Sequence, residues 1–119
     1  MGDYPLVRVK ENSLRVSFAP NAKGSSPRPL DMVLDFGQWG DVTGIEVINL
    51  LFQMGKNCLG IVAERVPTEG EPLRYAYDEA CDCFYLHLRT GRSFDQKTVQ
   101  GLALLDEDGR ITELGVEWR

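Results

Sequence analysis

Few residues of this 119-residue chain have the chemistry that enzymes use, and several of them fall in one short stretch. His87 is the only histidine, so any mechanism that needs an imidazole base must use it. Residues 83–89 alternate as a strand, so the residues on the same side as His87 are Cys83, Tyr85 and Arg89. The other side carries three apolar residues and is expected to be the buried one. We therefore interpret His87 as a solvated or cross-strand histidine, and we expect no catalytic residue and no enzymatic activity.

Two kinds of metal site can be tested against the residue types. Cys81, Cys83 and His87 share one strand phase, but a zinc site needs four ligands and the Cys-x-x-Cys spacing is absent. The acidic segment 106–109 could suggest Ca²⁺, yet the fifth position of a calcium loop counted from its first residue is Arg110, a cation. We therefore expect no metal and no cofactor, and we interpret residues 106–109 as a hairpin turn of the Asp-Gly type.

The strongest binding candidate is an aromatic residue in an expected turn. Trp39 lies between Gln38 and Gly40, in a segment that connects two expected strands. Tryptophan is enriched among the residues that dominate binding energy at protein interfaces. The alternative is that Trp39 folds back over its own strands and belongs to the core. We predict that Trp39 is at least partly exposed and that, with Gln38, it contributes to a surface for a protein partner or for self-association.

Self-similarity along the chain sets the expected architecture. The segment 40–47 is echoed by 109–116 at an offset of 69 residues, and apolar strands precede both segments. Both copies also share an irregularity. In the first, Val42 and Ile45 are three residues apart, so the inward phase of the strand slips, and the second copy repeats this slip. A β-bulge explains such a slip, and in the first copy we place it near Thr43-Gly44.

These patterns predict an α+β fold. Residues 1–49 are expected to form a first antiparallel repeat of four strands and residues 73–119 a second one. The two repeats would be related by pseudo-two-fold symmetry and packed as one globular domain. Residues 50–72 are expected to supply a helix and linker between them, with Asn49 as the cap of the helix. The sequence leaves open whether this helix ends near residue 55 or resumes from 58 to 65.

A motif in the second half carries a family resemblance. Tyr77-Asp78 is followed by a second aspartate at Asp82 and then by an alternating strand. The next hairpin begins with Leu105-Asp106 and continues through an acidic turn that ends in glycine. In these residues the chain resembles a bacterial family of small proteins, domain of unknown function 2283. That family ends its hairpin with Gly-Ile-Glu, whereas here Gly115-Val116-Glu117 lies two residues late.

The resemblance has consequences for both fold and function. It implies an antiparallel unit of four strands followed by a helix, and it brings no established catalytic residues. Members of the family look like partners of small ribosome-dependent ribonuclease toxins in some bacteria. The resemblance therefore implies an antitoxin-like role.

Charge and composition narrow the classes of partner and compartment. The net charge is −5, and the whole excess of acid lies in residues 61–119, which hold twelve Asp and Glu against seven Lys and Arg. This balance argues against nucleic acid and favours a basic protein partner, such as a toxin. The odd count of three cysteines indicates a reducing compartment. We find neither a signal peptide nor an apolar run near the ~20 residues of a membrane span. We therefore expect a cytoplasmic protein that has no membrane partner.

Taken with the missing catalytic signature, these observations predict a non-catalytic protein-interaction module. The alternative is a small-molecule-binding or enzymatic domain with a site between the two halves. The candidates for lining that site are Tyr77, Tyr85, His87 and Arg89.

Overall fold

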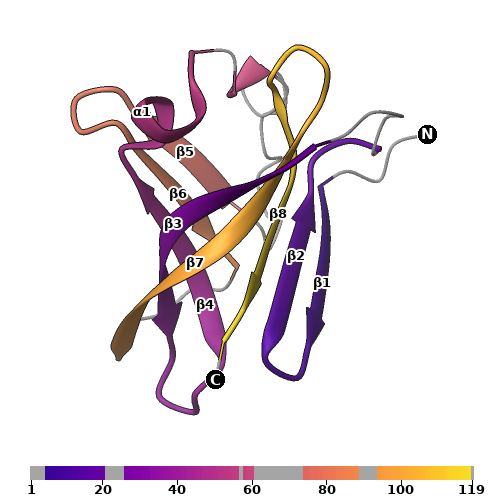
Figure 1. Cartoon of the computed structure of the whole chain (residues 1–119). Helices are drawn as coiled ribbons and strands as arrows, with labels where there is room; N and C mark the ends of the chain where they lie inside the picture. The colour runs from indigo at the N-terminus through magenta and orange to yellow at the C-terminus, as the bar shows by residue number, and fades with distance from the viewer. Residues whose placement is uncertain (1–4, 21–25, 57, 61–73, 89–93, 119) are drawn as a thin grey trace. The chain divides into compact units, whose positions relative to one another are not determined.

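The computed structural model describes residues 5–20, 26–56, 58–60, 74–88 and 94–118 (Figure 1). These residues form eight strands and one short helix. In chain order the elements are β1 (Leu6–Lys10), β2 (Ser13–Ser17), β3 (Ser26–Phe36), β4 (Val42–Ile48), α1 (Leu50–Met54), β5 (Arg74–Asp78), β6 (Cys83–His87), β7 (Asp95–Leu105) and β8 (Ile111–Glu117).

The expected α+β fold is wrong. The chain is mostly antiparallel strand, hydrogen-bonded in the single order β1-β2-β8-β7-β3-β4-β6-β5, and α1 has five residues. The two halves do not fold as separate four-stranded repeats joined by a helix. Instead the early hairpin β1–β2 pairs through β2 with β8, and the hairpin β5–β6 pairs through β6 with β4. Residues 61–73, where the helical connection was expected to continue, lie outside the described residues.

The chain divides into two compact units, and each draws on both halves of the sequence. Unit 1 comprises Met1–Leu30, Met54–Val66 and Gln100–Arg119, and unit 2 comprises Asp31–Gln53 and Pro67–Val99. In unit 1, therefore, β2 and β8 lie side by side although about a hundred residues separate them in the sequence.

The core of unit 1 is built by alternation along β2 and β8. Leu14 pairs with Val116 and Val16 pairs with Leu114, and all four side chains are buried. Successive residues of a strand face opposite sides, so the intervening polar residues of β2 must lie on the other face. The apolar residues of the two strands therefore build one buried face, and the polar residues build an open one.

Unit 2 uses the same rule on β4 and β6. Ile45 pairs with Leu86 and Val47 pairs with Phe84, and these four side chains are buried. The ring of Tyr75 on β5 extends this face, with its centroid 6.1 Å from that of Phe84. Tyr85 lies between Phe84 and Leu86 on β6, so it projects from the opposite face of the sheet.

The predicted β-bulge at Thr43 is confirmed. Asp35 pairs with Gly44 and Phe36 pairs with Val42, so Thr43 is the extra residue of β4. Its hydroxyl group donates a hydrogen bond to the carbonyl oxygen of Asp35 at 3.3 Å. The extra residue restores the inward phase of the strand beyond it, which is why Val42 and Ile45 can both be buried.

The hairpin β7–β8 repeats this geometry at the offset of 69 residues. Thr112 is its extra residue, and the hydroxyl group of Thr112 donates to the carbonyl oxygen of Leu104 at 3.1 Å. Both hairpin turns contain a glycine with a φ of 79°, Gly40 in the first and Gly109 in the second. Positive φ values are costly for residues with a Cβ atom, so the two glycines satisfy the same turn requirement.

The helix α1 is capped differently from the expectation. Asn49, the expected cap, has a φ of 58° and forms the bend into the helix. The residue that caps α1 is instead Asp82, from the turn between β5 and β6. Its two carboxylate oxygens accept hydrogen bonds from the backbone N–H groups of Leu51 at 2.9 Å and Phe52 at 3.2 Å. The hydroxyl group of Tyr77 donates to the same carboxylate at 2.6 Å. These tyrosine and aspartate letters of the family motif therefore have a structural role here.

The cap makes a testable prediction about pH. The hydrogen bond from Tyr77, then that from the Leu51 N–H group, hold the pKa of Asp82 below its ordinary value of 3.8. A lowered pKa in the folded state means that the stabilisation is complete above the unfolded value and is lost as the pH falls through the folded value. We expect Asp82→Asn to lower the thermal midpoint at pH 7. This difference from the wild type should shrink steadily as the pH falls below 3.8.

The substitution keeps the backbone feasible, since asparagine tolerates the φ of 54° that residue 82 adopts. Glu79→Ala, an exposed change in the same turn, is the control and should leave the midpoint unchanged at every pH. Circular dichroism melts from pH 7 to pH 2 measure both variants. A deficit of Asp82→Asn that stays constant down to pH 2 would contradict the role of the charged carboxylate.

Candidate binding surface

The turn between β3 and β4 holds Trp39 away from the core. The N–H group of Gly37 donates to the carbonyl oxygen of Asp41 at 2.7 Å, and that of Gly40 donates to Gly37 at 3.0 Å. This short closure leaves the side chains of Gln38 and Trp39 outside. The side chain of Trp39 is 85% exposed, so its predicted exposure is confirmed.

A second exposed aromatic residue, which the sequence reasoning missed, lies against the same hairpin. The N–H group of Phe94 donates to the carbonyl oxygen of Phe36 at 2.8 Å, where β3 ends, and the side chain of Phe94 is 63% exposed. Phe36 itself is half-buried. We call Phe36, Trp39 and Phe94 the aromatic tip of unit 2. The sequence signal for this site was Phe94 itself, a large apolar residue in an otherwise polar stretch. That stretch is far from Trp39 in the sequence.

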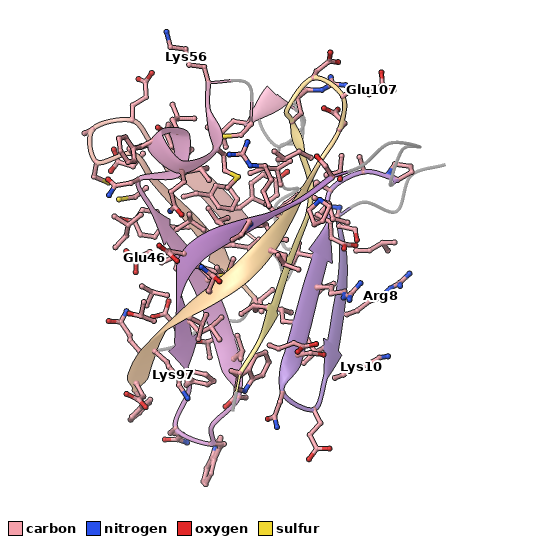
Figure 2. All side chains as sticks on the ribbon, viewed as in Figure 1. Arg8, Lys10, Glu46, Lys56, Lys97 and Glu107 are labelled. Carbon is pink, nitrogen blue, oxygen red and sulfur yellow. The ribbon has the colours of Figure 1, made fainter. Side chains whose placement is uncertain are left out.

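The residues next to the aromatic tip are mostly acidic. Among the described residues near it in sequence are Asp35, Asp41 and Asp95, together with the cation Lys97, which Figure 2 shows on β7. Arg92, two residues before Phe94, lies outside the described residues. The side-chain amide of Gln96 donates to the carboxylate of Asp35 at 2.7 Å, which ties the start of β7 to the end of β3. A surface with this balance of charge favours an approaching partner that is basic.

The structure brings together only part of the alternative cleft. Tyr85 and His87 project from one face of β6, with their rings stacked at a centroid distance of 6.5 Å and an interplanar angle of 8°. Tyr77 pairs with the buried Phe84, and therefore lies on the opposite face of the sheet. Arg89 lies outside the described residues. Within the described part of the chain, then, these residues do not line a common site.

The thiol of Cys83, next to Tyr85 on β6, is not arranged as a nucleophile. The thiol of Cys83 donates to the carbonyl oxygen of Cys81 at 3.2 Å, and the sulfur of Cys81 lies 3.9 Å from the hydroxyl group of Tyr85. The neighbouring Cys81 thiol and burial raise the pKa of Cys83, and the two thiols raise the pKa of Tyr85. Both groups therefore stay protonated near neutral pH, whereas thiol nucleophiles need the thiolate.

In the acidic turn after β7, the carboxylate of Asp106 is hydrogen-bonded within the turn itself. One oxygen of Asp106 accepts the backbone N–H groups of Asp108 and Arg110, each at 2.9 Å, and the other pairs with the Arg110 side chain at 2.8 Å. The predicted hairpin turn is confirmed by this arrangement. In the part of the chain that the structure describes, no three His, Cys, Asp or Glu side chains are grouped to hold a metal ion.

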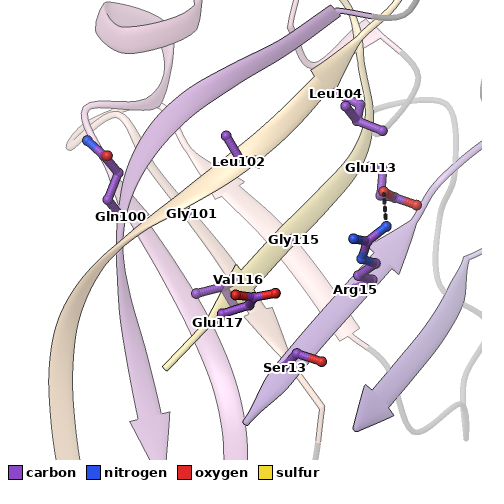
Figure 3. Close-up of a pocket in the computed structure, with 10 residues that line it drawn as sticks. All are labelled: Ser13, Arg15, Gln100, Gly101, Leu102, Leu104, Glu113, Gly115, Val116 and Glu117. Atoms are coloured by element: carbon purple, nitrogen blue, oxygen red, sulfur yellow. Dashed lines mark ion pairs between the residues drawn. The ribbon is translucent and has the colours of Figure 1, made fainter. Parts of the chain in front are cut away.

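A pocket that the sequence reasoning did not find lies on the open face of unit 1. Its volume is about 280 Å³, and Figure 3 shows the residues of β2, β7 and β8 that line it. Arg15 of β2 and Leu102 of β7 flank it, Gly115 lies between them, and Glu113 and Glu117 are at its two ends. The only sequence signal for this pocket was a glycine two residues later than the family motif places it.

Comparisons with known proteins leave the family open. No family model, no curated protein and no solved structure matches this chain. The resemblance of residues 73–118 to domain of unknown function 2283 therefore stays a prediction that rests on the motif residues. No helix among the described residues is long and apolar enough to cross a membrane.

The exposure of Trp39 predicts that its side chain does little for stability. We expect Trp39→Ala to change the free energy of unfolding by less than about 0.5 kcal/mol, as exposed substitutions usually do. Phe84→Ala, which empties a site that is 2% exposed, should cost about 3–5 kcal/mol. Urea denaturation of the two variants measures both values. If Trp39→Ala lost as much stability as Phe84→Ala, Trp39 would belong to the core.

Proposed function

We propose that this protein is a non-catalytic protein-interaction module that binds its partner through the aromatic tip. The observation that carries the proposal is Trp39, which is 85% exposed at the end of a closed hairpin. A tryptophan in this position leaves a large apolar surface in water, and conspicuous exposed apolar surface marks interaction sites in many proteins. Phe94, directly before β7, adds a second exposed aromatic side chain next to the end of β3.

The backbone of the aromatic tip is held in place before any partner binds. Its turn is closed by two backbone hydrogen bonds, and Phe94 is bonded to the end of the same hairpin. A surface that is already ordered loses little conformational freedom when it binds, so more of the contact energy becomes affinity. Truncation of a central aromatic residue at such an interface typically costs about 2 kcal/mol or more.

The partner that fits the tip is a basic protein. Among the described residues, three aspartates and one lysine are close to the tip in sequence, and the chain as a whole has a net charge of −5. An antitoxin-like role with a small basic toxin agrees with this charge, and rests on the family resemblance. The odd count of three cysteines, with Cys81 and Cys83 not joined by a disulfide, supports a reducing, cytoplasmic location.

The proposal predicts a selective loss of binding. The immobilised wild-type chain is compared with Trp39→Ala, Phe94→Ala and Phe52→Ala in capture experiments from the source organism. Phe52 is the matched control, because it is an aromatic residue with 89% exposure on α1 and is not part of the tip. We expect one or more basic proteins to be retained by the wild type and by Phe52→Ala, and to be lost with Trp39→Ala. Phe94→Ala should weaken the same capture.

Two results separate the alternatives. If sedimentation velocity shows a wild-type dimer that Trp39→Ala dissociates and Phe52→Ala does not, the partner at the tip is a second copy of the chain. If every retained protein binds equally well to Trp39→Ala and the chain is monomeric, the aromatic tip is not the binding surface and the proposal fails.

A further inference from the structure

The pocket on the open face of unit 1 has a glycine floor that the fold itself does not require. A Cβ atom built on Gly115 would meet only the Cγ atom of Arg15, at an ordinary contact distance of 3.8 Å. Gly44 differs, since a Cβ atom there would lie 2.9 Å from the carbonyl oxygen of Leu86. Glycine inside a strand is destabilising relative to residues with a side chain, and often marks a place where a ligand approaches the backbone.

The corresponding hairpin of unit 2 shows what normally fills this position. Gly115 pairs with Leu102, and at the same register Glu46 pairs with Val33. Across the other neighbouring strand, Gly115 pairs with Arg15 and Glu46 pairs with Tyr85. A side chain is thus accommodated at this place on β4, whereas β8 leaves it open. The pocket exists because position 115 carries no side chain.

A column of basic residues lies beside this floor, and an acidic residue lies at each end of it along β8. Arg8 and Lys10 of β1 pair with Arg15 and Ser13 of β2, so this part of the face is basic (Figure 2). Glu113 and Glu117 on β8 make the neighbouring column acidic. A face with adjacent basic and acidic columns complements a ligand that carries both charges close together.

The charged side chains at the pocket differ in how far they are exposed and free to bind a ligand. Glu113 is buried, accepts a hydrogen bond from the Ser17 hydroxyl group at 2.7 Å and lies 3.9 Å from the Arg15 guanidinium. That contact is long, and the Arg15 side chain is 65% exposed, so most of its N–H donors are open. Glu117 is exposed at the other end of the pocket. Leu102, half exposed, supplies apolar surface above the floor (Figure 3).

We propose that this pocket binds a free α-amino acid with an apolar side chain. The ligand's carboxylate accepts hydrogen bonds from Arg15, its ammonium group donates to Glu117, and its side chain lies on Leu102 above Gly115. Arginine suits the first role, because its planar fork of donors matches a carboxylate. The volume of about 280 Å³ suits one small molecule of this class. This site is in unit 1 and does not depend on the aromatic tip.

The test is titration calorimetry of the whole chain with L-leucine, leucinamide and N-acetyl-leucine. The last two keep the side chain but carry only the positive or only the negative charge. A ligand of this size with ordinary efficiency binds with a dissociation constant of about 10 mM or tighter. We expect L-leucine to bind and each singly charged analogue to bind about tenfold or more weakly, as the loss of a charge-assisted hydrogen bond predicts.

Variants locate the site. Arg15→Gln and Glu117→Gln should each weaken leucine binding about tenfold, and Gly115→Val should abolish it by filling the floor. Arg8→Gln is the matched control, because Arg8 pairs with Arg15 on the same face and does not line the pocket. Amide spectra and thermal melts verify that each variant is folded.

The possible outcomes decide the question. Failure of L-leucine to bind the wild type at about 50 mM, well above the expected constant, would overturn the proposal. So would equal binding of either analogue, since the ligand would then need only one charge. Equal effects of Arg8→Gln and Arg15→Gln would show a diffuse electrostatic effect of the face, and would also overturn it.

Discussion

The β-bulges at Thr43 and Thr112 are the constraint on which the rest of the structure depends. Side chains alternate between the two faces of a strand, so a shift of one residue exchanges the buried set for the exposed set. The extra residue in each hairpin makes that shift once, just after the turn. Beyond it, Ile45 and Leu114 enter the core, while Glu46 and Gly115 reach the open face. The bulges thus decide both the packing of the two units and the composition of their outer surfaces.

The sequence identified the local features because local interactions determine them. The slip in apolar spacing located the bulge at Thr43, and the Asp-Gly pair located the turn at Gly109. The exposure of Trp39 followed from its place in a short turn. Pairing of hairpins is a different problem, since β2 and β6 present similar alternating patterns and either could in principle pair with β4 or β8. Contacts between distant segments decide that choice, and periodicity does not record them.

The candidate sites show the same difference between local features, which the sequence predicts, and contacts between distant segments, which it does not. Phe94 could not be joined to Trp39 from the sequence, because their proximity depends on the backbone bond between Phe94 and Phe36. Nor could Asp82 be assigned to the helix that it caps, since the cap crosses from the turn before β6 to α1. This second case also gives two residues of the sequence motif a structural role. Tyr77 and Asp82 join the turn before β6 to the start of α1 through their hydrogen bonds.

The pairing of β2 with β8 has a consequence for the order in which the protein is made. Ser13 pairs with Glu117 and Ser17 with Glu113, so the centre of unit 1 joins strands that are about a hundred residues apart. During synthesis β2 leaves the ribosome before β8 and stays without this partner until β8 emerges. Its buried residues Leu14 and Val16 are exposed for that interval, and long-range strand pairing is slow in itself. Unit 2, whose strands β3 to β6 are close together in the sequence, can assemble its β4–β6 pairing earlier. The β4–β6 pairing of unit 2 can therefore form while the apolar face of β2 still lacks its partner strand.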